Sequence, residues 1–224
     1  MIGIIGAMES EIEILKKRIE DKKEINVGKF VFNTGKLAGK DVVILRSGVG
    51  KVAAATGATT MINMFHPDVI INTGIAGGKN VKRHSITLPT KFYYSDVDVT
   101  AFGYKLGQMP GCNEYFEADP KYLMLAKKAL KSLNLEAEEV SSLAGDSFIT
   151  SSKQLKFDLD GKVAYEMEGA GFAHATSLLN VPFIAIRFIS DLIGTDNQLD
   201  DYNEFEANAA QISNEIIMNV IKDL

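Results

Sequence analysis

The sequence lacks several features that would place it in particular classes of protein. It has one cysteine, Cys112, so no disulfide can form within the chain, as is typical of proteins from a reducing cytoplasm. No apolar run approaches the ~20 residues that a membrane-spanning helix needs. The first residues also lack the basic region of a signal peptide. We therefore expect a cytoplasmic protein with no membrane partner.

Positive charge is outnumbered by negative charge. The chain has 24 Lys and Arg against 29 Asp and Glu, which gives a net charge of −5. Binding to a phosphate backbone needs clustered cations, and the densest basic run, residues 16–23, is interrupted by Glu20 and Asp21. That run is typical of the solvated end of a helix. We expect no nucleic-acid partner.

Motifs for metal binding and for nucleophilic catalysis are missing as well. The three histidines, His66, His84 and His174, show no metal-like spacing among themselves or with Cys112. There is no G-x-S-x-G, and no motif pairs a serine or Cys112 with a base. The sequence therefore predicts no metal and no nucleophilic triad, and leaves carboxylate chemistry on a neutral small molecule.

The pattern of apolar residues predicts an α/β protein. With 224 residues and 46% hydrophobic content, the simplest division is a single domain over residues 1–224. Short runs rich in Ile and Val predict strands at 2–6, 41–45, 68–73 and 182–189. Helical patterns fall at 8–20, 51–65, 120–134, 166–180 and 203–222. A predicted hairpin near residues 30–44 adds antiparallel pairing, so we expect a mixed sheet with helices on both faces.

Two glycine-rich segments follow predicted strands. Residues 47–53, SGVGKVA, resemble a dinucleotide-binding turn, but the next strand ends at Gly74 without the acid that such a site needs. Residues 72–78, NTGIAGG, allow close approach of the backbone to a ligand, or form only a turn. We expect no nucleotide cofactor.

Acidic residues stand at three strand exits. Glu11 follows the first strand, and the helix dipole alone would favour an acid there. Glu166 and Glu168 follow a later strand, where one of them reaches a site or both belong to a solvated helix start. Asp191 ends the apolar run 183–191, and with Arg187 it forms either a structural ion pair or an active-site acid beside a cation.

Several segments, in order, resemble one known family. They are GIIGAMESE, SGVGKVAAA, DVIINTGIAGG, DVTAFGYKLGQMPG, GDSFI, EMEGAG and RFISD, and they cover almost the whole chain. The chain is similar to 5′-methylthioadenosine/S-adenosylhomocysteine nucleosidases. The resemblance implies the nucleoside phosphorylase-type fold, a three-layer α/β/α sandwich with a mixed central sheet, and usually a homodimer. It also implies hydrolysis of the N-glycosidic bond of 5′-thio-substituted adenosines, releasing adenine.

The resemblance assigns roles to individual residues. Asp191 would protonate N7 of adenine, Glu11 would activate water, and Glu168 would hold the ribose hydroxyls. Further residues would bind the substrate within the chain: Met8, Val49, Gly77, Phe148, Ile149, Met167, Arg187 and Tyr202. Loop residues would line the site of a partner subunit: Val99, Phe102, Tyr104 and Pro110.

Two positions depart from the family pattern. Ile75 stands where the family usually has a serine that helps to hold the water, and Tyr202 stands where a phenylalanine often closes the 5′ pocket. The alternatives are a related purine nucleoside hydrolase, such as one acting on futalosine, a phosphorylase, or a nucleoside binder without catalysis. Against the phosphorylase, Glu11 would repel phosphate at close range.

Overall fold

The computed structural model describes residues 1–223, and within residues 206–213 it describes the backbone alone. In chain order the elements are β1 (Ile2–Gly6), α1 (Glu9–Arg18), β2 (Glu20–Val27), β3 (Phe30–Leu37), β4 (Lys40–Arg46), α2 (Lys51–Phe65), β5 (Val69–Lys79), β6 (Ile86–Tyr94), η1 (Thr100–Phe102), β7 (Phe116–Glu117), α3 (Pro120–Ser132), β8 (Ala137–Ala144), η2 (Ser152–Gln154), β9 (Val163–Glu166), α4 (Gly169–Leu178), β10 (Phe183–Leu192) and α5 (Gln198–Asp223).

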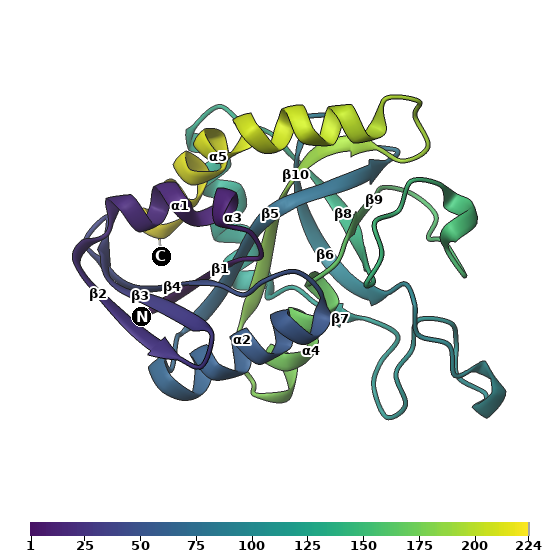
Figure 1. Cartoon of the computed structure of the whole chain (residues 1–224), viewed down its shortest axis with the longest axis horizontal. Coiled ribbons are helices and arrows are strands. Elements are labelled where there is room, and N and C mark those ends of the chain that lie inside the picture. The colour runs from purple at the N-terminus through teal and green to yellow at the C-terminus, as the bar shows by residue number, and fades with distance from the viewer. Residues whose placement is uncertain (224) are drawn as a thin grey trace.

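The strands form one mixed sheet (Figure 1). From one edge the order is β2, β3, β4, β1 and β5, with β1 parallel to both β4 and β5. Beyond β5 the sheet closes on itself: β5 pairs with β9 and with β10, and β8 and β6 link those two. The short strand β7 pairs with β6. The predicted mixed sheet is confirmed, and its five-stranded ring brings β5, β9 and β10 together at one end.

Helices cover both faces of the sheet, as predicted. In Figure 1, α1, α3 and α5 lie on one side, and α2 and α4 lie on the other. Every residue of β1 is buried, and so is every residue of β10 except Leu192. Such strands read as continuous apolar runs because both faces pack against helices. A fully buried Ile side chain contributes about 1.5–3 kcal/mol to folding, so these runs hold the layers together.

Two predicted boundaries differ from the structure in ways that matter for function. The helix predicted from residue 166 begins at Gly169, because β9 continues to Glu166, which pairs with Ala144 of β8. The last helix begins at Gln198, five residues before its predicted start at 203. Glu166 is therefore a strand residue, and Glu168 lies in the turn between β9 and α4.

Candidate functional site

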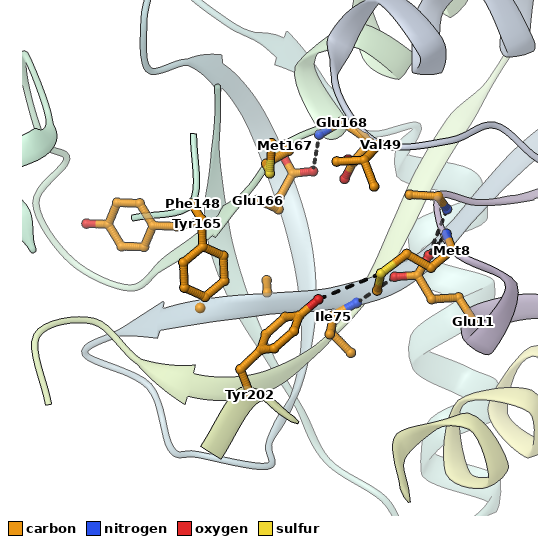
Figure 2. A pocket seen from close by; sticks show the side chains of 13 residues that line it. Met8, Glu11, Val49, Ile75, Phe148, Tyr165, Glu166, Met167, Glu168 and Tyr202 are labelled. Atoms are coloured by element: carbon orange, nitrogen blue, oxygen red, sulfur yellow. Dashed lines mark hydrogen bonds between the residues drawn. The ribbon is translucent and has the colours of Figure 1, made fainter. Parts of the chain in front are cut away.

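One cavity lies where β1, β4, β5 and β9 end (Figure 2). Carboxyl ends of strands are where α/β folds usually hold ligands. The cavity encloses about 80 Å³, and no Lys or Arg is among the residues that line it. The lining residues are Ala7, Met8, Glu11, Val49, Ile75, Ala76, Gly77, Phe148, Tyr165, Glu166, Met167, Glu168 and Tyr202.

Glu11 lies in the first turn of α1 and points its carboxylate toward β5. Its Oε2 accepts hydrogen bonds from the backbone N–H groups of Ala7 at 2.7 Å and Met8 at 3.0 Å, and its Oε1 accepts one from Ile75 at 3.2 Å. Burial raises the pKa of Glu11, while the bond from Met8 and the charge of Arg187 oppose that rise. Glu11 therefore caps the start of its own helix and also presents a buried carboxyl group to the cavity.

Glu168 lies across the cavity, in the turn between β9 and α4. Its Oε1 accepts a hydrogen bond from the backbone N–H of Gly50 at 2.9 Å, which ties this turn to the start of α2. Burial raises the pKa of Glu168, and repulsion from the nearby Glu166 carboxylate raises it further. The side chain is buried at 9% exposure, so a solvated helix start is excluded.

Glu166 connects the start of α4 with β8 and β10 through hydrogen bonds and an ion pair. Its Oε2 accepts hydrogen bonds from the backbone N–H groups of Glu168 at 2.9 Å and Gly169 at 2.6 Å, at the start of α4. Its Oε1 accepts one from Ser142 Oγ at 2.7 Å. Nη2 of Arg187 lies 3.0 Å from Oε2 in an ion pair whose side chains are both 2% exposed. Glu166 is therefore the counter-ion of Arg187 as well as the cap of α4.

Arg187 faces the back of the site. Its Nη2 also donates to Oδ1 of Asn72, while Nε and Nη1 have no hydrogen-bond partner among the described residues. A Cβ atom at Gly74 would lie 3.0 Å from Nη1 and 2.7 Å from Oε1 of Glu11. The absence of a side chain at Gly74 thus lets the cation and the Glu11 carboxylate approach the same stretch of β5. The expected alternative of an Arg187–Asp191 ion pair is wrong.

Asp191 is 1% exposed and lies at the end of β10, beside Gly77. A Cβ atom at Gly77 would lie 3.1 Å from Oδ2 of Asp191, so only a glycine leaves the carboxyl group this close to the cavity wall. Ser190 Oγ donates to Oδ1 at 2.5 Å, and Gln198 Nε2 donates to Oδ2 at 2.8 Å. Burial raises the pKa of Asp191, and these two hydrogen bonds act in the opposite direction.

Aromatic side chains cover one side of the cavity. Phe148 and Tyr202 meet edge to face, with ring centroids 5.3 Å apart (Figure 2). The hydroxyl of Tyr202 lies 3.7 Å from Sδ of Met8, so these side chains span the cavity from α5 to the residue that precedes α1. An aromatic face beside a sulfur and carboxylates suits a ligand that has a flat base and an apolar tail.

The structure brings together most of the residues singled out from the sequence. Those that line the cavity are Met8, Glu11, Val49, Gly77, Phe148, Met167, Glu168 and Tyr202. Those that lie behind its wall are Ile149, Arg187 and Asp191, all buried. Those that lie apart from it are Val99, Phe102, Tyr104 and Pro110, on the loop between β6 and β7 that extends away from the sheet in Figure 1.

Some polar partners in the site were not foreseen. The sequence suggested that one of the two glutamates would be functional, but it did not indicate that Glu166 pairs with Arg187. Neither Ser190 nor Gln198, which both contact Asp191, was predicted to belong to the site. Serine directly before the strand-end acid was the one available signal.

No motif in the sequence pairs Cys112 with a base, but the fold places His174 beside it. His174 Nε2 lies 3.6 Å from Sγ of Cys112, and the hydroxyl of Tyr94 lies 2.9 Å from Nδ1 of the same ring. Burial lowers the pKa of His174. None of these residues lines the cavity. Residues 62 positions apart meet through the fold, which spacing along the chain does not reveal.

The described part of the chain lacks two other kinds of site. No group of three or more His, Cys, Asp or Glu side chains is arranged to hold a metal ion. No helix there combines the length and the apolar character needed to cross a membrane.

Several solved structures resemble this chain over its full length. The chain is similar to a 5′-methylthioadenosine/S-adenosylhomocysteine nucleosidase from Neisseria meningitidis in complex with methylthio-immucillin-A, with 36% identity over 100% of this chain and 99% of that one, at a TM-score of 0.93. It is similar to the corresponding nucleosidase from Colwellia psychrerythraea 34H in complex with adenine, with 35% identity over 100% and 95%, at a TM-score of 0.88. A futalosine hydrolase mutant of Helicobacter pylori matches with 29% identity over 100% and 99%, at a TM-score of 0.92.

The family model described as "Phosphorylase superfamily" matches residues 1–222, almost the whole chain. The fold of these relatives, the nucleoside phosphorylase type, is therefore confirmed for this protein. From the full-length match and the shared fold, we conclude that the chain belongs to the phosphorylase superfamily.

Proposed function

We propose that the protein hydrolyses the N-glycosidic bond of 5′-methylthioadenosine and S-adenosylhomocysteine, and also of 5′-deoxyadenosine. The observation that carries this proposal is the placement of three buried carboxyl groups around one cavity: Glu11 and Glu168 in its wall and Asp191 behind Gly77. Superfamily membership and similarity to two nucleosidases, one holding adenine and one a nucleoside analogue, support it further.

Asp191 supplies the proton that the leaving base needs. As the bond between N9 and the ribose C1′ breaks, its electron pair moves into adenine, and a proton from Asp191 to N7 makes the base a neutral product. An ordinary aspartic acid has a pKa near 3.9 and would be ionised at neutral pH. Burial raises the pKa of Asp191, which favours the protonated form that this step requires.

Glu168 and Glu11 act on the sugar side. The transition state of glycoside hydrolysis resembles an oxocarbenium ion, so a carboxylate that hydrogen-bonds the ribose hydroxyls also stabilises the positive charge. Glu11, fixed by three backbone N–H groups, orients water and accepts its proton as the oxygen bonds to C1′. The N–H of Ile75 contributes to that fixation, although its side chain offers no hydroxyl to the water.

Water suits this site better than phosphate. The cavity wall carries Glu11, Glu166 and Glu168 and, within the described lining, no cationic side chain. A phosphate dianion entering such a cavity would meet like charges at close range. The acidic wall therefore favours hydrolysis over phosphorolysis.

A second copy of the chain is proposed to complete the site. The loop 99–110 lies outside its own cavity, and its Phe102 is 81% exposed. Beside it, α2 and α4 present an apolar hollow of about 560 Å³ that includes Val52, Leu178 and Leu179, all exposed. Exposed apolar surface of this kind marks interaction sites. Light scattering is expected to give the mass of a dimer, and a fully active monomer would refute this part of the proposal.

The first experiment measures adenine release from methylthioadenosine and S-adenosylhomocysteine by chromatography, in phosphate-free buffer and then with phosphate. Adenine and free thioribose without phosphate are expected. A strict requirement for phosphate, with a sugar 1-phosphate as product, would make the protein a phosphorylase. Ligand binding without release in either buffer would make it a binder.

Asp191→Asn tests the acid within the same assay. The variant keeps the shape of the side chain but has no carboxyl proton, so kcat is expected to fall by about 10²–10⁴ while substrate binding changes less. Normal turnover in this variant would overturn the assignment of Asp191.

The similarity to a futalosine hydrolase supports one alternative substrate. Futalosine and inosine therefore belong in the same assay. The backbone oxygen of Ile149 accepts a hydrogen bond at the base end of the site. This acceptor suits the amino group of adenine better than the carbonyl oxygen of a 6-oxopurine, which favours adenosine-type substrates.

A further inference from the structure

The side-chain amide of Gln198 lies at the innermost end of the proposed base site. Gln198 is the first residue of α5 and is 4% exposed. Its Nε2 donates to the backbone oxygen of Ile149 at 2.7 Å and to Oδ2 of Asp191 at 2.8 Å. Two acceptors from different segments thus converge on one NH₂ group.

The orientation of this amide is fixed by its other end. Oε1 of Gln198 accepts a hydrogen bond from the backbone N–H of Gly194 at 3.0 Å. An N–H can bond only to the oxygen of the amide, so the NH₂ group must face Ile149 and Asp191. All the hydrogen-bonding groups of the amide are used, which explains how it tolerates burial.

Adenine bound as proposed would place an identical group in the same position. Its exocyclic amine lies between N7 and the Watson–Crick edge of the ring, and it carries two N–H donors. A base with N7 at Asp191 and its Watson–Crick edge at Ile149 therefore directs those donors at the same two oxygens. Each oxygen has a second lone pair, but the NH₂ groups of Gln198 and of adenine cannot both occupy the one position that bridges the two oxygens.

We propose that Gln198 occupies the amino-group position of the base site in the free protein, and that adenine must displace its side chain to reach Asp191. This inference rests on the proposed function, because it assumes that an adenine base binds against Asp191 and Ile149. Gln198 is then a gate at the base end of the site, and a residue that sets the affinity for the nucleoside.

Two further observations agree with a closed site. The cavity of about 80 Å³ is far smaller than the ~300–1,000 Å³ of typical small-molecule sites. Asp191 does not line it, although Gly77, directly in front of the carboxyl group, does. Removing the Gln198 side chain from between Ile149 and Asp191 would give the base direct access to the acid.

The test compares adenine binding by calorimetry in the wild type and in Gln198→Met. Methionine is similar in length but has no N–H donor, so it removes the competition for the two oxygens. Adenine is expected to bind about 10-fold more tightly to the variant, since about one net hydrogen bond no longer has to be broken. Gln154→Met is the matched control, because Gln154 also bridges backbone groups near Phe148 yet does not contact Asp191. The control is expected to show no gain in affinity.

Each other outcome has a definite meaning. Unchanged or weaker binding to Gln198→Met, with adenine still bound by the wild type, would overturn the gate and leave the proposed function intact. In that case Gln198 would hold Asp191 in place throughout the reaction. No adenine binding by either protein would overturn the base site itself, and the gate with it.

Hydrogen exchange in the wild type tests the same idea without a substitution. When Gln198 leaves, the N–H of Gly194 loses its acceptor Oε1. Saturation with adenine is therefore expected to speed exchange at Gly194, while exchange slows at Ile75 and Gly77 in the cavity wall. Slower exchange at Gly194 on binding would contradict displacement, even if Gln198→Met failed to fold.

Discussion

Replacement of Glu166 by glutamine gives a quantitative test of the ion pair behind the site. The glutamine oxygen can still accept from the backbone N–H groups of Glu168 and Gly169, and Ser142 can turn its hydroxyl to accept from the new NH₂ group. The change therefore removes mainly the negative charge opposite Arg187. Both side chains are 2% exposed, so the guanidinium is left as a buried charge without its counter-ion.

Removal of one partner from a buried ion pair typically costs about 3–5 kcal/mol. For a chain of this length each kcal/mol lowers Tm by roughly 2–4 °C, so Glu166→Gln is expected to melt about 6–20 °C lower. Urea unfolding followed by circular dichroism gives the free energy of unfolding directly. Glu13→Gln is the matched control, because both Glu13 and its partner Lys17 are exposed and an exposed ion pair contributes little to stability.

The double variant Glu166→Gln/Arg187→Met separates charge from packing. If the loss in Glu166→Gln comes from the unpaired guanidinium, the double variant is expected to be clearly more stable than the sum of the single losses predicts. A loss below about 1 kcal/mol in Glu166→Gln, or strict additivity in the double variant, would refute the view that this pair holds the site together.

Further predictions concern the cavity itself. The pKa of Glu168 is raised in the folded state, so ionising this group destabilises the folded protein. The destabilisation is absent below the ordinary pKa of glutamate and develops as the pH rises through the raised pKa. The Tm of Glu168→Gln relative to the wild type should therefore rise from about pH 4 to about pH 8, and a constant difference would contradict this. The raised pKa of Asp191 predicts that kcat/KM falls on the alkaline side as its proton is lost, which a pH profile measures. Ile75→Ser should raise kcat by giving the water a hydroxyl partner. An unchanged kcat would show that Glu11, held by the backbone N–H of residue 75, orients the water without that hydroxyl. Gly77→Ala places a Cβ atom 2.7 Å from Cδ1 of Ile193 and 3.1 Å from Asp191, and should cost about 1–3 kcal/mol in urea unfolding together with most of the activity.

The strands could be predicted because burial on both faces leaves a simple signature. Residues 2–6 contain only Ile and Gly, and residues 183–189 contain only Ile, Phe and Ala apart from Arg187, so each is a short and nearly unbroken apolar run. An apolar run does not indicate which strands pair with each other in the sheet. The placement of β9 between β5 and β8, which closes the ring, depends on contacts between distant segments.

Some residues of the site could also be predicted from the sequence, and others could not. Glu11, Glu168 and Asp191 could be singled out because acids at the ends of buried strands are unusual, and the family resemblance ranked them. The partner of Arg187 could not, because Glu166 is 21 positions away and an acid only four positions away, Asp191, offered a simpler pairing. Gln198 belongs to no motif, and only its burial against Ile149 and Asp191 gives it a role.

The closed ring of strands has a consequence for how the protein reaches its folded state. Strand β5 ends at Lys79, but its partner β10 begins at Phe183, so about 100 further residues must be made before the two strands can pair. Contacts between such distant segments slow folding. Until β10 arrives, the edge of β5, with its apolar residues 69–71, is open to pairing with other chains. The strand that delivers Asp191 to the site therefore also protects the nascent protein from aggregation, and a chain that ends before residue 183 would lack both.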